Sequence, residues 1–315
     1  MRRHALLLAL ALAACGACRP APSPRATNDA STDAEGGELV VYATEYPVAY
    51  FAERLVAGLG RVVCPVPEGE DPIHWEPTRD VLDDFRAASL VVTNGAGFAR
   101  WIENASLPES RLVRTADGFQ DEFLHFEVRT HSHGPGGEHT HSGLDPHTWL
   151  DPVNARRQAE AIAEALAARL PSERARIDAN LAELRSDLEA LEAEWRTLDG
   201  PLEGVTLLAN HRAYDYLLRR FGWAATSLDL APDAAPTAEA LADVRGARVE
   251  GTRHVMLWES EPRAEVRARL ASELGVESVV VPPAEILSAK EREAGEDYLG
   301  LQRAAIDRLR AALAP

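Results

Sequence analysis

The sequence is poor in cysteine and in positive charge. Three cysteines occur among 315 residues, and only Cys64 lies in the expected folded body, so no disulfide framework is indicated. We expect Cys64 to be a small, buried apolar residue. The 33 Lys and Arg residues are outnumbered by 50 Asp and Glu, which gives a net charge of −17 at pH 7. Because nucleic-acid binding depends on basic side chains that meet phosphates, no nucleic-acid partner is expected, whereas cations are compatible with this balance.

Three sequence signatures of common enzymes are also missing. The chain has no His-Glu-x-x-His pair, no Gly-x-Ser-x-Gly elbow and no glycine-rich phosphate loop. These are the usual motifs of zinc peptidases, α/β-hydrolases and P-loop enzymes. We therefore expect that the protein is not an enzyme.

The N-terminus has the pattern of an export signal. A basic start at 1–4 precedes an apolar run at 5–14, which is shorter than the roughly twenty residues that span a bilayer. Leu12-Ala13-Ala14-Cys15 is similar to a bacterial lipobox, in which cleavage before the cysteine leaves a lipidated N-terminus. The sequence thus predicts a signal peptide at 1–14, a lipid on Cys15 and a flexible tether at 15–37, with an ordinary cleaved signal as the alternative. A lipid at Cys15 would hold the protein to a membrane, outside the cytoplasm.

From Glu38 onward, short β-branched runs alternate with helical stretches, which predicts mainly parallel sheets covered by helices. The expected strands lie at 39–42, 61–64, 90–93, 205–208, 223–227, 254–258 and 279–281. Helices in the first half are expected at 50–58, 79–88 and 97–105. The sequence therefore predicts an α/β protein with two lobes, at 38–171 and 199–315.

A long helical pattern at 172–198 separates the two lobes. Its apolar residues are spaced 4-3-4-3-4, at Ile177, Leu181, Leu184, Leu188, Leu191 and Trp195. With a rise of 1.5 Å per residue, the helix would be about 40 Å long. The stripe could also support a coiled-coil dimer, but it is short and α/β patterns flank it. We favour an intramolecular helix that joins the lobes rigidly in a monomer and resists wide hinge closure.

Histidine is concentrated in one polar, glycine-rich stretch. Six of the ten histidines lie between His125 and Asp151. The histidine-rich loop at 125–142 contains His125, His131, His133, His139 and His141. Neutral imidazole is the commonest metal ligand among side chains, so the loop predicts metal binding. A solvated polar loop without a function is the alternative.

Three histidines follow apolar runs. They lie in Pro72-Ile73-His74-Trp75, in Asp145-Pro146-His147-Thr148-Trp149 and in Asn210-His211-Arg212. Open α/β sheets bind ligands beyond the carboxyl ends of their strands, so the three are candidates for one site. Each alone is more often a hydrogen-bonded structural residue.

The block from Asp145 to Pro152, Asp-Pro-His-Thr-Trp-Leu-Asp-Pro, together with the long helix, resembles the zinc/manganese-type solute-binding lipoproteins of ABC importers, the ZnuA/TroA/PsaA-like family. The resemblance extends from Glu38 to Leu313. It implies one metal ion held between the lobes. The ligands that it implies are His74, His147, His211 and, as the acidic member, Glu285.

Two details depart from the family pattern. Ile73 separates Pro72 from His74, where the family usually has Pro directly before His, and Glu285 stands where Asp is usual. The competitors for the acidic position are Glu259, Glu296 and Asp297, and water could complete the site instead.

The third ligand position indicates the metal. The resemblance implies Glu there in manganese-type members and His in zinc-type members, and this chain has His211. Three imidazoles favour zinc, copper, iron or nickel, and one carboxylate would complete zinc's common tetrahedral shell. We therefore expect Zn²⁺, with manganese or iron as the alternative. A zinc hydrolase with an open fourth position is an alternative of another class, as is a surface adhesin or zinc buffer.

The resemblance also implies a setting for the site. The histidine-rich loop would overhang it as a secondary, weaker zinc site, and the membrane permease subunit of an ABC importer would be the docking partner. Asp151 could accept a hydrogen bond from a ligand imidazole, but we expect it to cap the helix that begins near Val153. Trp75 and Trp149 could wall the site or pack in the core.

Overall fold

The computed structural model describes residues 38–126, 131–132, 138–139 and 143–314. The expected signal peptide at 1–14, the lipidation site Cys15 and the tether at 15–37 lie outside these residues. By its internal contacts, the chain divides into Met1–Gly37 and Glu38–Pro315. No helix within the described ranges is long and apolar enough to cross a membrane.

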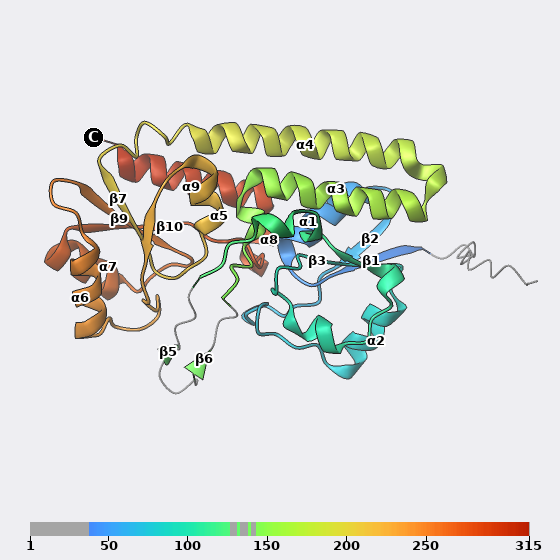
Figure 1. Cartoon of the computed structure of the whole chain (residues 1–315), viewed down its shortest axis with the longest axis horizontal. Coiled ribbons are helices and arrows are strands. Elements are labelled where there is room, and N and C mark those ends of the chain that lie inside the picture. The colour runs from blue at the N-terminus through green and yellow to red at the C-terminus, as the bar shows by residue number, and fades with distance from the viewer. Residues whose placement is uncertain (1–37, 127–130, 133–137, 140–142, 315) are drawn as a thin grey trace, which may run out of the picture. The chain divides into compact units, whose positions relative to one another are not determined.

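The N-terminal lobe contains a parallel sheet with the strand order β2-β1-β3-β4 (Figure 1). Its strands are β1 (Leu39–Ala43), β2 (Gly60–Val63), β3 (Leu90–Thr93) and β4 (Leu112–Arg114). Its helices are α1 (Tyr46–Leu55), α2 (Arg79–Ala87), η1 (Arg100–Asn104), η2 (Glu109–Arg111) and η3 (Asp117–Glu122), the last three being 3₁₀ helices. All of β3 is buried, as expected for a strand covered on both faces.

The C-terminal lobe contains a second parallel sheet, with the order β10-β9-β7-β8. Its strands are β7 (Val205–Ala209), β8 (Ala225–Ser227), β9 (Arg253–Trp258) and β10 (Val276–Val280). Its helices are α5 (Asp215–Phe221), α6 (Ala238–Ala247), α7 (Ala264–Leu274), α8 (Ala289–Glu293) and α9 (Tyr298–Leu313). The repeated strand-helix order explains why all pairs in both sheets are parallel.

Two long helices connect the lobes. The 3₁₀ helix η5 (Thr148–Leu150) leads into α3 (Pro152–Arg169), and the short η6 (Pro171–Glu173) separates α3 from α4 (Arg174–Arg196). With 23 residues, α4 is about 35 Å long. It packs along α1 and α3 of the N-terminal lobe and along α9 of the C-terminal lobe (Figure 1). Its apolar stripe from Ile177 to Trp195 is buried within the chain, so the stripe cannot serve a coiled-coil partner.

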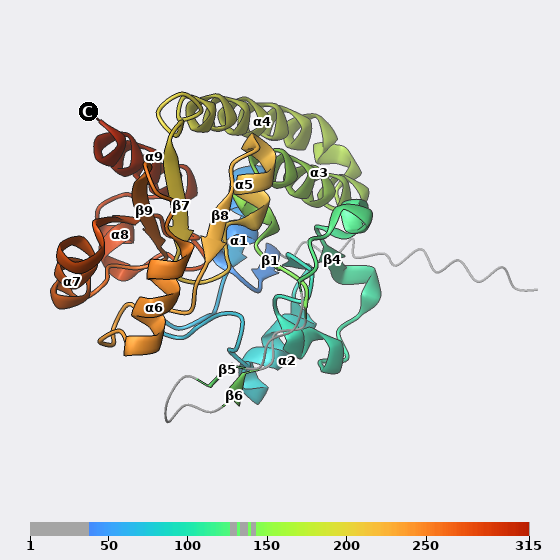
Figure 2. The same cartoon turned by 60° about the vertical axis from the view of Figure 1, so that its left-hand side comes forward.

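One hydrophobic core runs through both lobes. It includes Val41 and Val92 from the first sheet, Leu257 from the second, and Leu188 and Trp195 from α4. Smaller apolar clusters include residues of α2 in one lobe and of α6 and α7 in the other. Figure 2 shows these three helices on the side of the sheets away from α4. Because burial of apolar surface stabilises the shared core, a wide separation of the lobes would be costly.

The predicted two-lobe α/β architecture is confirmed, but several element boundaries differ. The helix expected at 97–105 is only the 3₁₀ turn η1, because three successive residues at 95–97 have positive φ and prevent an earlier helix start. Helix α1 begins at Tyr46 rather than Tyr50, since Pro47 fits its first turn. Strand β4 was not predicted, because three half-buried residues show no usable period.

Candidate metal site

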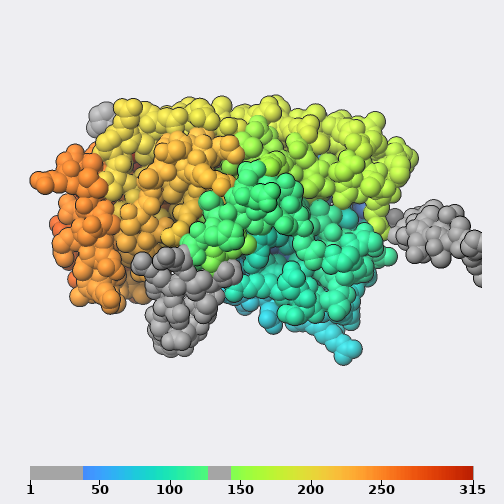
Figure 3. Space-filling model, viewed as in Figure 1, coloured from blue at the N-terminus to red at the C-terminus, as the bar shows by residue number. Residues whose placement is uncertain are grey.

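The candidate residues lie where both sheets present the carboxyl ends of their strands. Asn94 follows β3, His211 follows β7 and Glu259 follows β9. Asn94 also donates to the carbonyl group of Pro146 at 2.8 Å, which ties the segment 145–151 to this edge. In Figure 3, the green surface lies between the teal N-terminal lobe and the orange C-terminal lobe. Open α/β sheets use this position for ligands.

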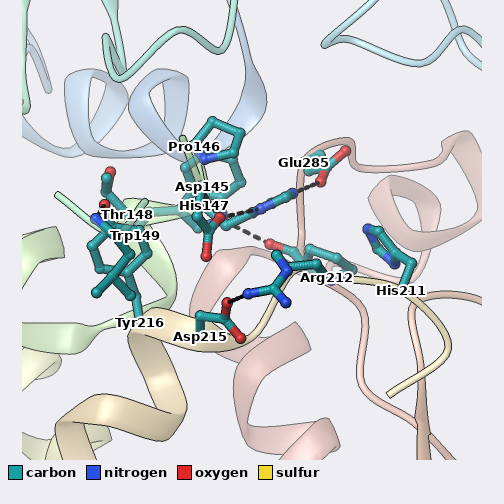
Figure 4. Close-up of polar contacts among 12 residues, drawn as sticks. Asp145, Pro146, His147, Thr148, Trp149, His211, Arg212, Asp215, Tyr216 and Glu285 are labelled. Atoms are coloured by element: carbon teal, nitrogen blue, oxygen red, sulfur yellow. Dashed lines mark hydrogen bonds and ion pairs between the residues drawn. The ribbon is translucent and has the colours of Figure 1, made fainter. Parts of the chain in front are cut away.

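His147 is buried between two carboxylates that are far apart in the sequence. Its Nδ1 lies 2.8 Å from Asp145 Oδ1, and its Nε2 lies 2.8 Å from Glu285 Oε1 (Figure 4). Burial, the largest single influence, lowers the pKa of His147, but the hydrogen bonds and charges of Asp145 and Glu285 together outweigh it and raise the pKa to about 10. The two carboxylates thus favour the protonated imidazole, which has one N–H for each of them.

Aromatic rings and a buried amide fix the position of His147. The ring centres of Phe98 and Trp149 lie 6.4 and 5.5 Å from that of the imidazole. Asn94 Nδ2 donates to the carbonyl group before His147, and Asn94 Oδ1 accepts from the hydroxyl group of Thr148, which follows it. Both chain neighbours of the imidazole are thus held by one side chain.

A buried polar network extends behind this clamp. Asn94 Oδ1 also accepts from Gln158 Nε2 at 2.7 Å, and Gln158 Nε2 donates to Thr115 Oγ1 at 2.8 Å. The backbone N–H of Asn94 donates to the carboxylate of Glu45. Burial raises the pKa of Glu45 to about 7. The network ties the ends of β1 and β3 to α3, and buried networks of this kind restrict local motion.

Asp151 caps α3, as the sequence predicts. Its Oδ1 accepts from Val153 N at 2.9 Å and from Arg220 Nε at 2.7 Å. The carboxylate that holds the imidazole is instead Asp145, which sequence reasoning did not single out. The sequence did contain a signal for this role, because an aspartate often accepts from the backbone N–H two residues further on. Asp145 stands two residues before His147, and His147 N donates to Asp145 Oδ1 at 3.0 Å in such a local turn.

The two tryptophans near the candidate ligands pack in different places. Trp149 is fully buried, and its Nε1 donates to Pro283 O at 2.7 Å, so it lies in the core directly beside His147. Trp75 packs edge-on against Trp101 under α2, with ring centres 6.1 Å apart. Trp149 is therefore both a core residue and a wall of the site.

His211 approaches His147 from the C-terminal lobe. The two imidazole ring centres lie 6.1 Å apart (Figure 4). His211 Nδ1 lies 2.8 Å from Glu259 Oε2. Although burial raises the pKa of Glu259, the hydrogen bonds and charges of His211 and neighbouring groups outweigh it and lower that pKa. Each of the two histidines thus has a carboxylate against its Nδ1.

Glu285 is held near His147 by its own backbone. Tyr46 N donates to Glu285 O at 3.1 Å, which joins the first residue of α1 to the segment after β10. The preceding residue, Ala284, is buried and has a φ of 61°. A left-handed conformation costs a non-glycine residue roughly 1–2 kcal/mol, and such strain is concentrated at functional sites.

His74 lies on an exposed loop between β2 and α2. Its side chain is 44% exposed, and its Nε2 lies 3.9 Å from Asp71 Oδ2. Ile73, the residue that is additional to the family pattern, packs against the main core. In this loop, the side chain that points inward is therefore that of Ile73. Burial, and then the charge of Glu285, raise the pKa of Asp71.

The four predicted ligands do not form one coordination shell in this structure. His147 contacts Glu285 and lies beside His211, but no three His, Cys, Asp or Glu side chains of the described residues are arranged to hold one ion. What the arrangement supplies is two imidazoles and one carboxylate at the junction of the lobes. Such donors suit a borderline cation such as Zn²⁺.

The histidine-rich loop begins and ends next to the segment that carries His147. His125 pairs with Leu144 in an antiparallel bridge, and Asp145 N donates to Leu124 O at 2.9 Å. Further out, β5 (His131–Ser132) pairs antiparallel with β6 (Glu138–His139). The predicted ligands His133 and His141 lie outside the described residues. The base of the loop is thus a paired stem that ends at the site.

A comparison with protein families matches residues 41–312 to the family described as zinc-uptake complex component A, periplasmic. Among curated proteins, the high-affinity zinc uptake system protein ZnuA of Bacillus subtilis is 28% identical over 308 residues, which cover 96% of this chain and 94% of that protein. The zinc-binding lipoprotein AdcA of Streptococcus pneumoniae is 26% identical over 84% of this chain. The chain spans only 54% of AdcA, about half its length.

Among solved structures, the metal-dependent lipoprotein YcdH of Bacillus subtilis matches with a TM-score of 0.75 and 25% identity. The match covers 87% of this chain and 98% of YcdH. Two parallel sheets, the long helix and the Asp-Pro-His block at their junction agree with the resemblance that the sequence predicts. The chain belongs to the periplasmic zinc-uptake component A family of solute-binding proteins.

Proposed function

We propose that this protein is an extracytoplasmic receptor that binds Zn²⁺ between its two lobes and delivers it to an ABC importer. The observation that carries the proposal is the convergence of His147 Nε2 and Glu285 Oε1, 2.8 Å apart, beside His211. Relatives of the same length and family, such as ZnuA of Bacillus subtilis, are named for zinc uptake. The protein catalyses no reaction in this proposal, because a carboxylate closes the fourth position at the ion.

The proposed ligands are His74, His147, His211 and Glu285. Zn²⁺ replaces the proton on His147 Nε2 and separates His147 from Glu285, so that both become ligands. His74 joins them through a shift of the exposed loop between β2 and α2. Three imidazoles and one carboxylate favour zinc over manganese, which prefers oxygen donors.

Capture and release then depend on loop movement more than on lobe separation. The shared hydrophobic core and α4 hold the lobes together. The loop of His74 is held less firmly: Ile73 and Trp75 pack against apolar clusters, but the His74 side chain is 44% exposed, and Glu68 accepts from Ala289 N at 3.2 Å at an exposed position. Elements with little burial open at low free-energy cost. Docking on the permease subunit therefore releases zinc by moving this loop away from His147 and His211.

The proposed cellular setting follows from the N-terminal sequence. A lipid on Cys15 and the tether at 15–37 would keep the receptor beside the importer in its membrane. The relative AdcA is named a lipoprotein, and the lipobox pattern of this chain supports the same anchor. Mass spectrometry of the membrane fraction, with Cys15→Ala as the control, tests for the lipid.

Zinc and manganese titrations of the chain from Gly36 onward test the proposal. One tight, equimolar zinc site with weaker manganese binding is the expected result, because the donors are mainly nitrogen. Competition with a chromophoric chelator measures the affinity, and elemental analysis measures the metal content. Tighter binding of manganese than of zinc would refute the assignment of the cargo.

We also propose that the histidine-rich loop is a weaker, exchangeable zinc site beside the main one. Deleting residues 130–142 leaves the stem formed by His125 and Leu144, so the surroundings of His147 stay intact. The deletion is expected to remove weak zinc equivalents and to change the tight affinity less than tenfold, about 1.4 kcal/mol. Zinc titration of the two chains in parallel is the measurement. Loss of the tight site in the deleted chain would contradict this division.

A further inference from the structure

We infer that Glu259 is a positioning residue for metal binding: its carboxylate lies 2.8 Å from His211 Nδ1 and accepts the Nδ1–H when the ring turns to present Nε2 to the ion. In the present orientation of the ring, Nδ1 has no partner with hydrogen-bond geometry among the described residues. This inference rests on the proposed function, since it assumes that His211 binds zinc. The sequence alone offers Glu259 as a competitor of Glu285 for the fourth ligand position. The inference instead makes Glu259 a support for the ligand His211.

The register of the second sheet brings the two residues together. Strands β7 and β9 are parallel neighbours, with Ala209 opposite Leu257. The chain after β7 and the chain after β9 therefore emerge side by side at the same edge. There, His211 Nδ1 lies 2.8 Å from Glu259 Oε2, and both side chains are about one-third exposed, at 34% and 33%.

A buried amide fixes the Glu259 carboxylate. Asn210 is 1% exposed and precedes His211. Its Oδ1 accepts from the backbone N–H of Glu259 at 3.0 Å, and its Nδ2 donates to Glu259 Oε1 at 3.3 Å. The same Nδ2 also donates to Leu230 O at 3.1 Å, which anchors the amide to the chain after β8. One carboxylate oxygen is thus held by Asn210 while the other faces His211.

This arrangement determines how His211 can bind an ion. A carboxylate at Nδ1 favours the tautomer with its proton on that atom, orients the ring and makes Nε2 a stronger donor. In the other lobe, Asp145 already forms such a hydrogen bond with His147 Nδ1. Each lobe therefore places a carboxylate near the Nδ1 of its imidazole. Because both oxygens of Glu259 contact other groups, it supports a ligand rather than acting as one.

A double-mutant cycle on the chain from Gly36 onward tests the inference with Zn²⁺ itself. Glu259→Ala is expected to weaken zinc binding 10- to 100-fold, the usual effect of removing such a carboxylate. In a His211→Ala background, the same change is expected to alter affinity less than about twofold, the scatter between independent sites. Glu259→Gln keeps an acceptor oxygen for the Nδ1–H, so it should restore much of the affinity lost in Glu259→Ala.

Glu261→Ala is the matched control, because Glu261 lies two residues further on, is exposed and pairs with Arg267 at 2.5 Å. It should bind zinc as the parent chain does, and thermal unfolding of each metal-free variant reports folding. An equal loss from Glu259→Ala in both backgrounds would overturn the inference and make Glu259 a ligand. No loss in the parent background would also overturn it. If His211→Ala alone leaves affinity unchanged, the proposed site itself fails, and the inference fails with it.

Discussion

Replacing His147 by alanine is expected to weaken zinc binding at least 100-fold, about 2.8 kcal/mol. The change removes the imidazole whose Nε2 contacts Glu285 from the C-terminal part of the chain. It also removes the donor whose chain neighbours, Pro146 and Thr148, are held in place by Asn94. Chelator competition at constant pH measures the loss.

The same substitution should destabilise the metal-free protein. Asp145 is fully buried, and its Oδ2 has no hydrogen-bond partner among the described residues, so His147 is its principal compensating charge. Removing one member of a buried ion pair typically costs about 3–5 kcal/mol, because the other charge remains without a partner. Urea unfolding of the metal-free chains measures this effect.

His254→Ala is the control for both measurements. His254 is also a buried histidine, but it lies at the beginning of β9, where its Nε2 contacts the backbone of Val249 at 3.1–3.2 Å. This end of the strand is opposite to the edge that carries Glu259 and His211. Zinc affinity should therefore be unchanged in His254→Ala. Retention of the tight site in a folded His147→Ala chain would show that zinc binds elsewhere.

The sequence identified the parts of the site that are local in the chain. The Asp-Pro-His block carried the family resemblance, and its local turn explains why Asp145 and His147 act together. The neighbouring Asp-Pro start of α3 predicted the cap at Asp151 correctly, because a helix start depends on a few adjacent residues. Such features need only short-range geometry.

The contacts between distant segments could not be derived from spacing. His147 and Glu285 are separated by 138 positions, and only the packing of the lobes brings them to 2.8 Å. The resemblance proposed Glu285 as a ligand, but it gave no sign that Glu285 contacts His147 in this structure. The contact of His211 with Glu259 could have been found, because neighbouring parallel strands end at one edge, but this needs the order of β7 and β9.

The position of His74 illustrates a different difficulty. In the sequence, Ile73 is an additional residue before His74. In the structure, Ile73 packs against the core, and the side chain of His74 is 44% exposed. One apolar side chain can thus decide which way a short loop faces, because its burial competes with the direction that a ligand needs. The assignment of His74 as a ligand stays a prediction.

Zinc affinity is expected to rise about tenfold for each pH unit between pH 7 and 9, because one proton must leave His147 for each ion bound. The sign follows from the pKa of His147, which Asp145 and Glu285 raise to about 10 against the effect of burial. Below that value, Nε2 carries a proton in the metal-free protein, and zinc has to displace it. As pH increases toward 10, the displacement becomes easier and the affinity increases.

Calorimetry in two buffers with different protonation enthalpies measures this proton directly. The chain without residues 130–142 is the suitable host, and zinc is added below one equivalent, so that only the tight site fills. About one proton per zinc is expected at pH 7.5 from His147, and the number should be unchanged in His254→Ala. The carboxylate of Glu45, with a pKa of about 7, is largely ionised above that pH and contributes little change. A constant zinc affinity from pH 7 to 9 would mean that His147 Nε2 is not protonated before zinc binds, or that it is not a ligand.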